Sequence, residues 1–205
     1  MLRITPAEPM TWVFVGDSIT HGCLHTHGNR NYVEHCTEVL RWQTGRTTDV
    51  VINAGVSGWR VPDLLGDFDF RLARFIPDVV VLMLGTNDAT AGESGRQAFS
   101  SQLQELAPRI RALGAELVLQ VPPLLRGESS GRADMPAYRD AIRAVADGLD
   151  VPIVDHARDW EAHLPDGGLD EWLADDIHPN AAGHLRMART LLGALGIAGD
   201  PLCNH

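Results

Sequence analysis

Short runs of apolar residues alternate along this chain with longer stretches in which apolar residues recur at helical spacing. This alternation is typical of βα units that surround a parallel sheet. The run at 79–84 is the most continuous and the richest in β-branched residues, so we expect it to be the central strand, buried on both faces. Pro152 favours an edge position or a strand start for the last run. The five expected strands are residues 12–15, 50–52, 79–84, 116–121 and 151–155.

The segments between these runs predict helices. In the last of them Leu185, Ala188, Leu191 and Leu195 recur at helical spacing, and Asn180 is the expected N-cap. The pattern predicts a three-layer α/β/α fold with a parallel sheet, as a single domain over residues 1–205 with its core at about 12–195. Residues that carry function gather at the carboxyl ends of the strands in such sheets. The expected helices are residues 30–44, 60–75, 96–113, 134–149 and 180–195.

The charge composition excludes several classes of partner and chemistry. There are 17 basic and 27 acidic residues, for a net charge of −10. Such a surface repels phosphates and anionic headgroups, which argues against a nucleic-acid partner. Every basic residue other than histidine is arginine, so a Schiff-base lysine, a phosphate-loop lysine and a Ser-Lys dyad are excluded.

The remaining features of the sequence concern the cellular location of the protein and its cysteines. No apolar run approaches the roughly 18 residues that a membrane span needs. Residues 1–9 lack a long apolar stretch and a cleavage site, so we expect no signal peptide and a cytoplasmic protein. A chain secreted after removal of its signal would look the same. The sequence does not give the oligomeric state. Three cysteines at irregular spacing, Cys23, Cys36 and Cys203, form neither a disulfide framework nor a zinc pattern.

Polar residues follow three of the expected strands at the point where each ends. The first strand leads into residues 16–18, the second into 53–58 and the third into 85–88. If these strands are parallel neighbours, the three segments converge on one edge of the sheet. A fourth polar group, residues 175–179, stands near the C-terminus.

Together these segments contain the groups that ester hydrolysis needs. Ser18 supplies a hydroxyl nucleophile, and His178 is a base for its proton. Asp175 lies three residues before His178, so its carboxylate is placed to accept the imidazole Nδ1–H. The backbone N–H groups of Ser18 and Gly58 and the Asn87 amide form the expected oxyanion hole. Gly58 allows the backbone to approach a substrate closely.

The four segments resemble the motif blocks of the SGNH (GDSL) hydrolase superfamily, in family order, over about residues 12–195. The resemblance implies a flavodoxin-like fold and hydrolysis of a small-molecule ester or thioester without metal or other cofactor. It assigns Ser18 as nucleophile, Gly58 and Asn87 as oxyanion donors, His178 as base and Asp175 as its partner. In this family the aspartate at position 17 braces the nucleophile turn. The blocks are Gly16-Asp17-Ser18-Ile19-Thr20, Asn53-Ala54-Gly55-Val56-Ser57-Gly58, Gly85-Thr86-Asn87-Asp88 and Asp175-Asp176-Ile177-His178-Pro179, where spacing favours Asp175 over Asp176.

Other residues offer competing interpretations. Residues 127–131 fit the Gly-x-Ser-x-Gly nucleophile elbow, but residues 122–126 separate them from the strand, so we interpret them as a loop that can border the cleft. Cys23 is near Ser18, yet nothing in sequence activates it, so we expect a buried or half-buried thiol. Trp59 either walls the substrate pocket or packs into the adjoining helix, and Trp42 is expected to pack.

A histidine-rich stretch follows Ser18. A metal site is an alternative there, because a His-x-His pair can chelate, but the stretch lacks an ordered set of cysteine or carboxylate partners. We expect no metal, and the role of the stretch remains open. Its members are His21, His25, His27 and His35.

The connections between the expected strands and helices are short, so they leave few residues to form a lid over the site or a long tunnel for an acyl chain. We therefore expect a serine esterase for short-chain acyl groups, such as acetyl on a carbohydrate or a small alcohol. The alternatives are a lipase or thioesterase, an acyltransferase that uses the same acyl-enzyme, and a non-catalytic carbohydrate-binding module on the same fold.

Overall fold

The computed structural model describes residues 8–129 and 131–202. Five parallel strands form one sheet in the order β2-β1-β3-β4-β5, which is the flavodoxin-like order. The N-terminal segment 1–7, on which the expectation of no signal peptide partly rests, lies outside the described residues, as do Ser130 and Cys203. The strands are β1 (Thr11–Gly16), β2 (Val50–Asn53), β3 (Val79–Met83), β4 (Glu116–Val121) and β5 (Ile153–Asp155).

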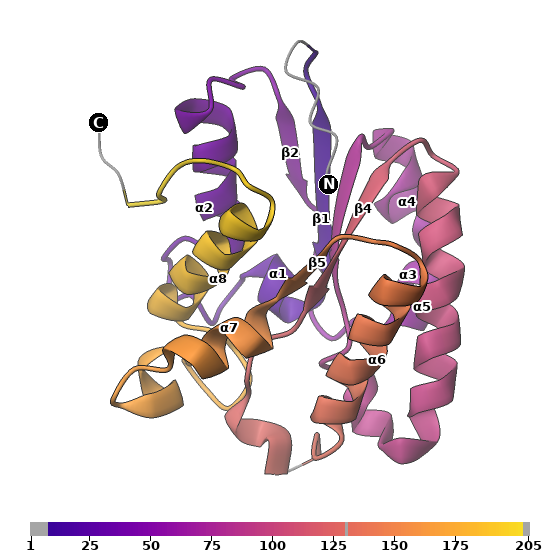
Figure 1. Ribbon diagram of the computed structural model, residues 1–205, viewed down its shortest axis with the longest axis vertical. Helices are drawn as coiled ribbons and strands as arrows, with labels where there is room; N and C mark the ends of the chain where they lie inside the picture. The colour runs from indigo at the N-terminus through magenta and orange to yellow at the C-terminus, as the bar shows by residue number, and fades with distance from the viewer. Residues whose placement is uncertain (1–7, 130, 203–205) are drawn as a thin grey trace.

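Helices cover both faces of this sheet (Figure 1). α2, α7 and α8 lie on one face and α3 to α6 on the other, so the three-layer α/β/α prediction is confirmed. α2 continues into a π-helical turn, Val39–Gln43. The helices are α1 (Ser18–His21), α2 (Tyr32–Glu38), α3 (Val61–Gly66), α4 (Phe68–Arg71), α5 (Arg96–Arg111), α6 (Met135–Gly148), α7 (His156–His163) and α8 (Ala181–Ala194).

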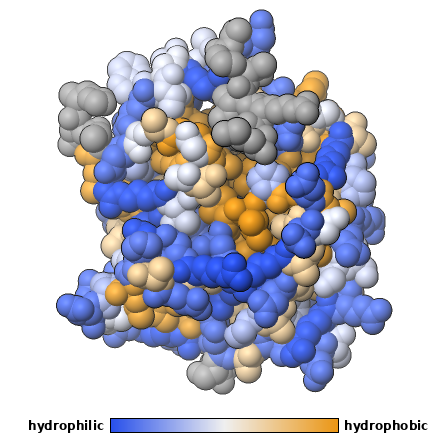
Figure 2. All heavy atoms as spheres, in the orientation of Figure 1, coloured by the Kyte–Doolittle hydropathy of each residue, from blue (hydrophilic) through white to orange (hydrophobic). Residues whose placement is uncertain are grey.

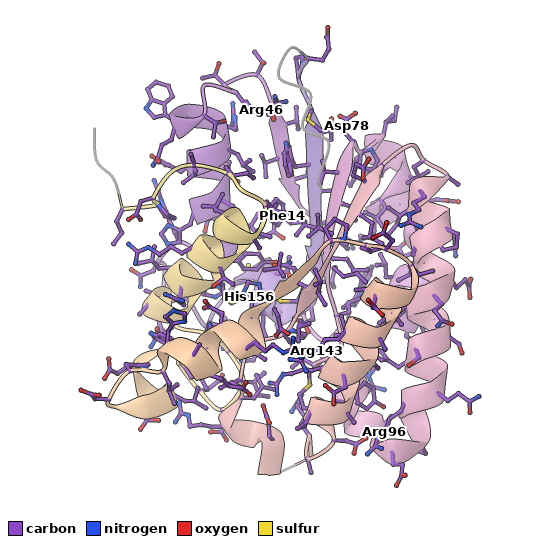
Figure 3. All side chains as sticks on the ribbon, in the orientation of Figure 1. Phe14, Arg46, Asp78, Arg96, Arg143 and His156 are labelled. Atoms are coloured by element: carbon purple, nitrogen blue, oxygen red, sulfur yellow. The ribbon has the colours of Figure 1, made fainter. Side chains whose placement is uncertain are left out.

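The strands build two separate apolar cores because successive side chains point to opposite faces. Val13 and Val15 of β1 pack with the α3 to α6 layer. Trp12 and Phe14 pack on the other face with α2 and α8, where Figure 3 labels Phe14. Every residue of β3 is buried, so its prediction as the central strand is confirmed.

The element boundaries depart from the sequence pattern in identifiable places. The helix expected over 60–75 is broken after Gly66, a residue of low helix propensity, into α3, α4 and a 3₁₀ turn, Ala73–Phe75. Asn180 caps α8 as expected, because its Oδ1 accepts hydrogen bonds from two amides of the first turn. Trp42, expected to pack, is 70% exposed on the π-helical turn, so that prediction is wrong. Among the described residues, no helix combines the length and apolarity of a membrane span.

β5 forms one edge of the sheet, as Pro152 before it suggested. Apolar side chains gather at the middle of the face shown in Figure 2, over this strand, where Ile153 is 36% exposed. Charged residues border them: Arg143 Nε donates to Asp155 Oδ2 at 2.7 Å, and Arg143 is labelled in Figure 3. Charges beside an edge strand discourage pairing with another chain.

A chain of buried polar side chains crosses the core beneath α1. Thr20 Oγ1 lies 2.9 Å from the Tyr32 hydroxyl, to which Gln120 Nε2 donates at 3.2 Å. His156 Nε2 lies 2.9 Å from Gln120 Oε1. Because an amide oxygen only accepts, the imidazole of His156 carries its proton on Nε2. His156, at the start of α7, is fully buried, and burial lowers its pKa to about 4 (Figure 3).

This burial predicts a pH-dependent contribution to stability. The unfolded chain protonates His156 below about pH 6.5 while the folded chain keeps it neutral to about pH 4, so this group lowers the free energy of unfolding as pH falls between them. The destabilisation caused by His156→Gln should therefore be smaller at about pH 5 than at about pH 7, by about 2 kcal/mol. Denaturant unfolding at both pH values measures it. The exposed His163→Gln is the control, and an equal loss for His156→Gln at both pH values would contradict the assignment.

Candidate active site

The first turn of α1 presents Ser18 at the carboxyl end of β1. Asp17 is the N-cap, and its Oδ1 accepts a hydrogen bond of 3.0 Å from the Ile19 amide. Its side chain is fully buried, and its Oδ2 has no partner among the described residues. Burial raises the pKa of Asp17 to about 7, although the bond from Ile19 opposes this. Asp17 thus holds the turn that carries Ser18.

The last residue of β2 and the segment that follows it hold α1 in place. Asn53 Nδ2 donates to the Thr20 carbonyl at 2.7 Å, and Asn53 Oδ1 accepts from the Gly55 amide at 3.0 Å. A Cβ at Gly55 would lie 2.5 Å from the His21 amide nitrogen, so only glycine allows this approach. The second motif block is therefore the support on which the Ser18 helix rests.

The Gly58 turn is held from the end of β3. Gly58 has φ of 83°, a conformation that favours glycine. Asn87 Nδ2 donates to the Trp59 carbonyl at 3.1 Å, and Asp88 Oδ1 accepts from the Val61 amide at 3.0 Å. Within residues 8–129 and 131–202 the Gly58 N–H has no acceptor. The third block thus positions the second one and leaves this donor available.

Arg132 also acts on this side of the site, and sequence reasoning missed it. Its Nη2 donates to Asn87 Oδ1 at 3.3 Å, and its Nε donates to the Thr86 carbonyl at 2.9 Å. These bonds fix which way the Asn87 amide faces. One N–H of the amide is used by Trp59, so the other remains for a ligand. The signal for Arg132 was its place directly after the loop at 127–131.

The fourth block places His178 against Ser18. The distance from His178 Nε2 to Ser18 Oγ is 2.8 Å, and the distance from His178 Nδ1 to Asp175 Oδ2 is 2.8 Å. Asp175 Oδ1 also accepts from the amides of Ile177 and His178, at 2.8 and 2.7 Å. The ionised carboxylate only accepts, so the imidazole proton sits on Nδ1 and Nε2 accepts from Ser18. Asp176 is exposed, and the carboxylate that contacts His178 is Asp175.

The charges of this pair are set by its surroundings. Partial burial raises the pKa of Asp175, but hydrogen bonds from the His178 and Ile177 amides and from the imidazole outweigh it and lower the pKa to about 2. Desolvation lowers the pKa of His178 below its ordinary value, although Asp175 acts in the opposite direction. At neutral pH the site therefore holds an ionised carboxylate and a neutral imidazole.

Two members of the histidine-rich stretch lie at the site. His21 Nδ1 is 3.1 Å from Ser57 Oγ. The ring of His25 stacks on that of His178, with centroids 3.4 Å apart and planes 4° apart. His25, Asp175 and His178 each offer a metal-ligand atom, all within 4.8 Å of one another. A cation there would compete with the hydrogen bonds that join His178 to Ser18 and Asp175.

The structure also gives positions for the other residues that the sequence singled out as candidates. Cys23 is exposed, so the expectation of a buried or half-buried thiol is wrong. Trp59 packs against the apolar core, and the guanidinium of Arg71 lies 5.0 Å from its ring centroid. The segment around the alternative serine motif forms a 3₁₀ turn, Arg126–Ser129, between the end of β4 and the start of α6. It is therefore not a strand-to-helix elbow.

Comparison with known proteins identifies relatives of this chain in sequence and in fold. The model of the GDSL-like Lipase/Acylhydrolase family matches residues 14–186. An acetylxylan esterase from Geobacillus stearothermophilus is 26% identical over 208 residues, which cover 90% of this chain and 93% of that protein. A multidomain esterase from Ruminococcus flavefaciens is 25% identical over 217 residues and 85% of this chain, which spans only 27% of that relative. An alpha/beta hydrolase enzyme from the metagenome of Lake Arreo, Spain, superposes with a TM-score of 0.81 at 26% identity, over 95% of this chain and 98% of that one.

The geometry predicts that Ser18 reacts selectively with a fluorophosphonate probe. Its hydroxyl faces an imidazole oriented by a carboxylate, whereas Ser57 faces His21, which forms no ion pair with a carboxylate among the described residues. We expect one labelled serine in the wild type, no labelling in Ser18→Ala and full labelling in Ser57→Ala. Intact-mass and peptide mass spectrometry measure this. Labelling that survives Ser18→Ala would refute the selectivity.

Proposed function

The chain belongs to the GDSL-like lipase/acylhydrolase family of carboxylic ester hydrolases, and we propose that it removes short acyl groups from carbohydrate or small alcohol esters through Ser18. The observation that carries the proposal is the 2.8 Å approach of Ser18 Oγ to His178 Nε2, with Asp175 on the other nitrogen. A nucleophile, a base and an orienting carboxylate in hydrogen-bond contact are the arrangement of serine hydrolases.

Acylation begins at Ser18. Its oxygen attacks the ester carbonyl while its proton passes to His178 Nε2. Asp175 keeps the proton of the resting imidazole on Nδ1 and stabilises the imidazolium that forms. The imidazolium then gives its Nε2 proton to the leaving alkoxide, which leaves an acyl group on Ser18.

The negative oxygen of the tetrahedral intermediate needs donors that are already in place. We assign this role to the amides of Ser18 and Gly58 and to the remaining N–H of Asn87. The Gly58 turn and the Asn87 amide are bonded to each other through Trp59, so both donors are fixed before substrate arrives. Such preorganised donors contribute about 3 kcal/mol each to transition-state stabilisation.

In deacylation the same base, His178, activates a water molecule. His178 takes a proton from a water molecule that attacks the acyl carbonyl, and it returns the proton to Ser18 as the acid leaves. The side chain of Asp175 is 44% exposed, so this edge of the site is open to water. Open access favours hydrolysis over transfer of the acyl group to another alcohol.

The substrate class rests on two observations. One relative, covered over 93% of its length, is an acetylxylan esterase. The connections that surround the site are short turns, such as Asp88–Ala91 and Arg126–Ser129, which provide no long channel for an acyl chain. Both favour acetyl or a similarly small acyl group on a sugar.

Turnover of nitrophenyl esters tests the nucleophile and the acyl preference together. Ser18→Ala should lower kcat with nitrophenyl acetate by about 10³-fold or more, because no other group replaces the nucleophile. Ser57→Ala should retain wild-type kcat. The wild-type rate should be highest for acetyl and fall with acyl length, and acetate should be released from acetylated xylo-oligosaccharides.

Equal rates for Ser18→Ala and wild type would remove Ser18 from the mechanism. A maximum at long acyl chains would indicate a lipase instead. Formation of a new ester in the presence of a sugar acceptor, with little free acid, would indicate an acyltransferase.

The pH dependence of kcat/KM should report His178. The imidazole must be neutral to accept the serine proton, and desolvation lowers its pKa. Activity should therefore persist below the ordinary histidine pKa of about 6.5 and fall only as pH drops further. A pH profile with the acidic midpoint above about 6.5 would contradict this assignment.

A further inference from the structure

The ring of His25 lies flat on the ring of His178, from a part of the chain that no motif block includes. The centroids are 3.4 Å apart and the planes differ by 4°. His25 Nδ1 is also 3.2 Å from Asp175 Oδ2, the oxygen that faces His178 Nδ1. One carboxylate oxygen thus faces two parallel imidazoles.

The loop that carries His25 is held in a fixed shape. Leu24 and His27 on either side adopt φ of 71° and 49°, left-handed conformations that are strained for residues with a Cβ. Thr26 is buried, and its Oγ1 donates to the Gly22 carbonyl at 3.0 Å. Such strain persists only where surrounding contacts determine the conformation. The position of His25 is therefore built into the loop.

Asp175 and His178 lie close to solvent, so contact with the His25 ring can restrain them. Asp175 Oδ1 accepts from two backbone amides, but the side chain as a whole is 44% exposed, so the carboxylate that faces His178 borders solvent. The His25 ring covers one face of His178 and one side of that oxygen. Rotation of the His178 ring about its Cβ–Cγ bond would drive its edge into the His25 ring, since stacked rings are already at van der Waals distance.

We propose that His25 is a positioning residue of the site: its ring holds the His178 imidazole in the plane that joins Asp175 to Ser18. This inference rests on the proposed function for its kinetic consequence, but the restraint on His178 exists whether or not the chain hydrolyses esters. The flat ring carries the restraint, so phenylalanine at position 25 should retain most of it and alanine should lose it.

The kinetic test compares His25→Ala with His25→Phe. His25→Ala should lower kcat about 10- to 100-fold with KM within about twofold, because a loosened base costs rate and not ground-state binding. His25→Phe should recover kcat to within about threefold of wild type, since it keeps a flat ring over His178. His27→Asn is the matched control: the residue is an exposed histidine of the same loop, and asparagine tolerates its left-handed backbone.

A second readout is independent of turnover. Proton NMR of the His178 Nδ1–H, assigned by its loss in His178→Gln, measures exchange of this proton with water. Exchange should be about tenfold faster in His25→Ala, and close to wild type in His25→Phe and His27→Asn, because opening of the Asp175 contact controls it.

The outcomes separate the two proposals. Wild-type kcat and exchange in His25→Ala overturn the positioning role, as does a His25→Phe variant that is as impaired as His25→Ala. If turnover is equal in wild type and Ser18→Ala, the proposed function fails, and the exchange rates alone then support or overturn the restraint on His178.

Discussion

The backbone hydrogen bonds that pair β1 with β2 and β3 in parallel set the position of everything at the site. They bring the carboxyl ends of the three strands together, with Gly16 opposite Met83 and Phe14 opposite Asn53. The segments that follow the strands must then share one small space. Each segment holds the next: Asn53 holds α1, and Asn87 and Asp88 hold the Gly58 turn. The site is thus held together by hydrogen bonds from side chains of one segment to the main chain of the next.

The same edge of the sheet keeps its carboxyl groups in different states. Asp17 is fully buried with a raised pKa of about 7, and burial also raises the pKa of Asp88 to about 6. Asp175 accepts three hydrogen bonds at the surface and its pKa is lowered to about 2. The two buried carboxyl groups therefore serve as structural acceptors for backbone amides, and the one that faces the base keeps its charge.

Local sequence was sufficient for features that depend on neighbouring residues. The run at 79–84 gave the central strand, Asn180 gave a helix cap, and the motif segments gave the residues that the structure brings together. α1 has four residues, too few for helical periodicity to be visible, and α7 was missed as well. Arg132 and His25 act on residues 45 and 153 positions away, a relation that no local pattern encodes. Cys23 and Trp42 were misjudged because hydrophobic character does not fix exposure.

The buried chain from His156 to Thr20 has a direction. Gln120 turns its amide oxygen to His156 and its amide nitrogen to the Tyr32 oxygen, so the imidazole donates to the amide and the amide donates to the phenol oxygen. That oxygen then accepts, and its own hydrogen is left for Thr20. Each bond polarises the next in the same sense. The hydrogens of these bonds therefore follow a single pattern, which runs from the imidazole at the start of α7 through Gln120 and Tyr32 to the Thr20 hydroxyl, two residues from Ser18.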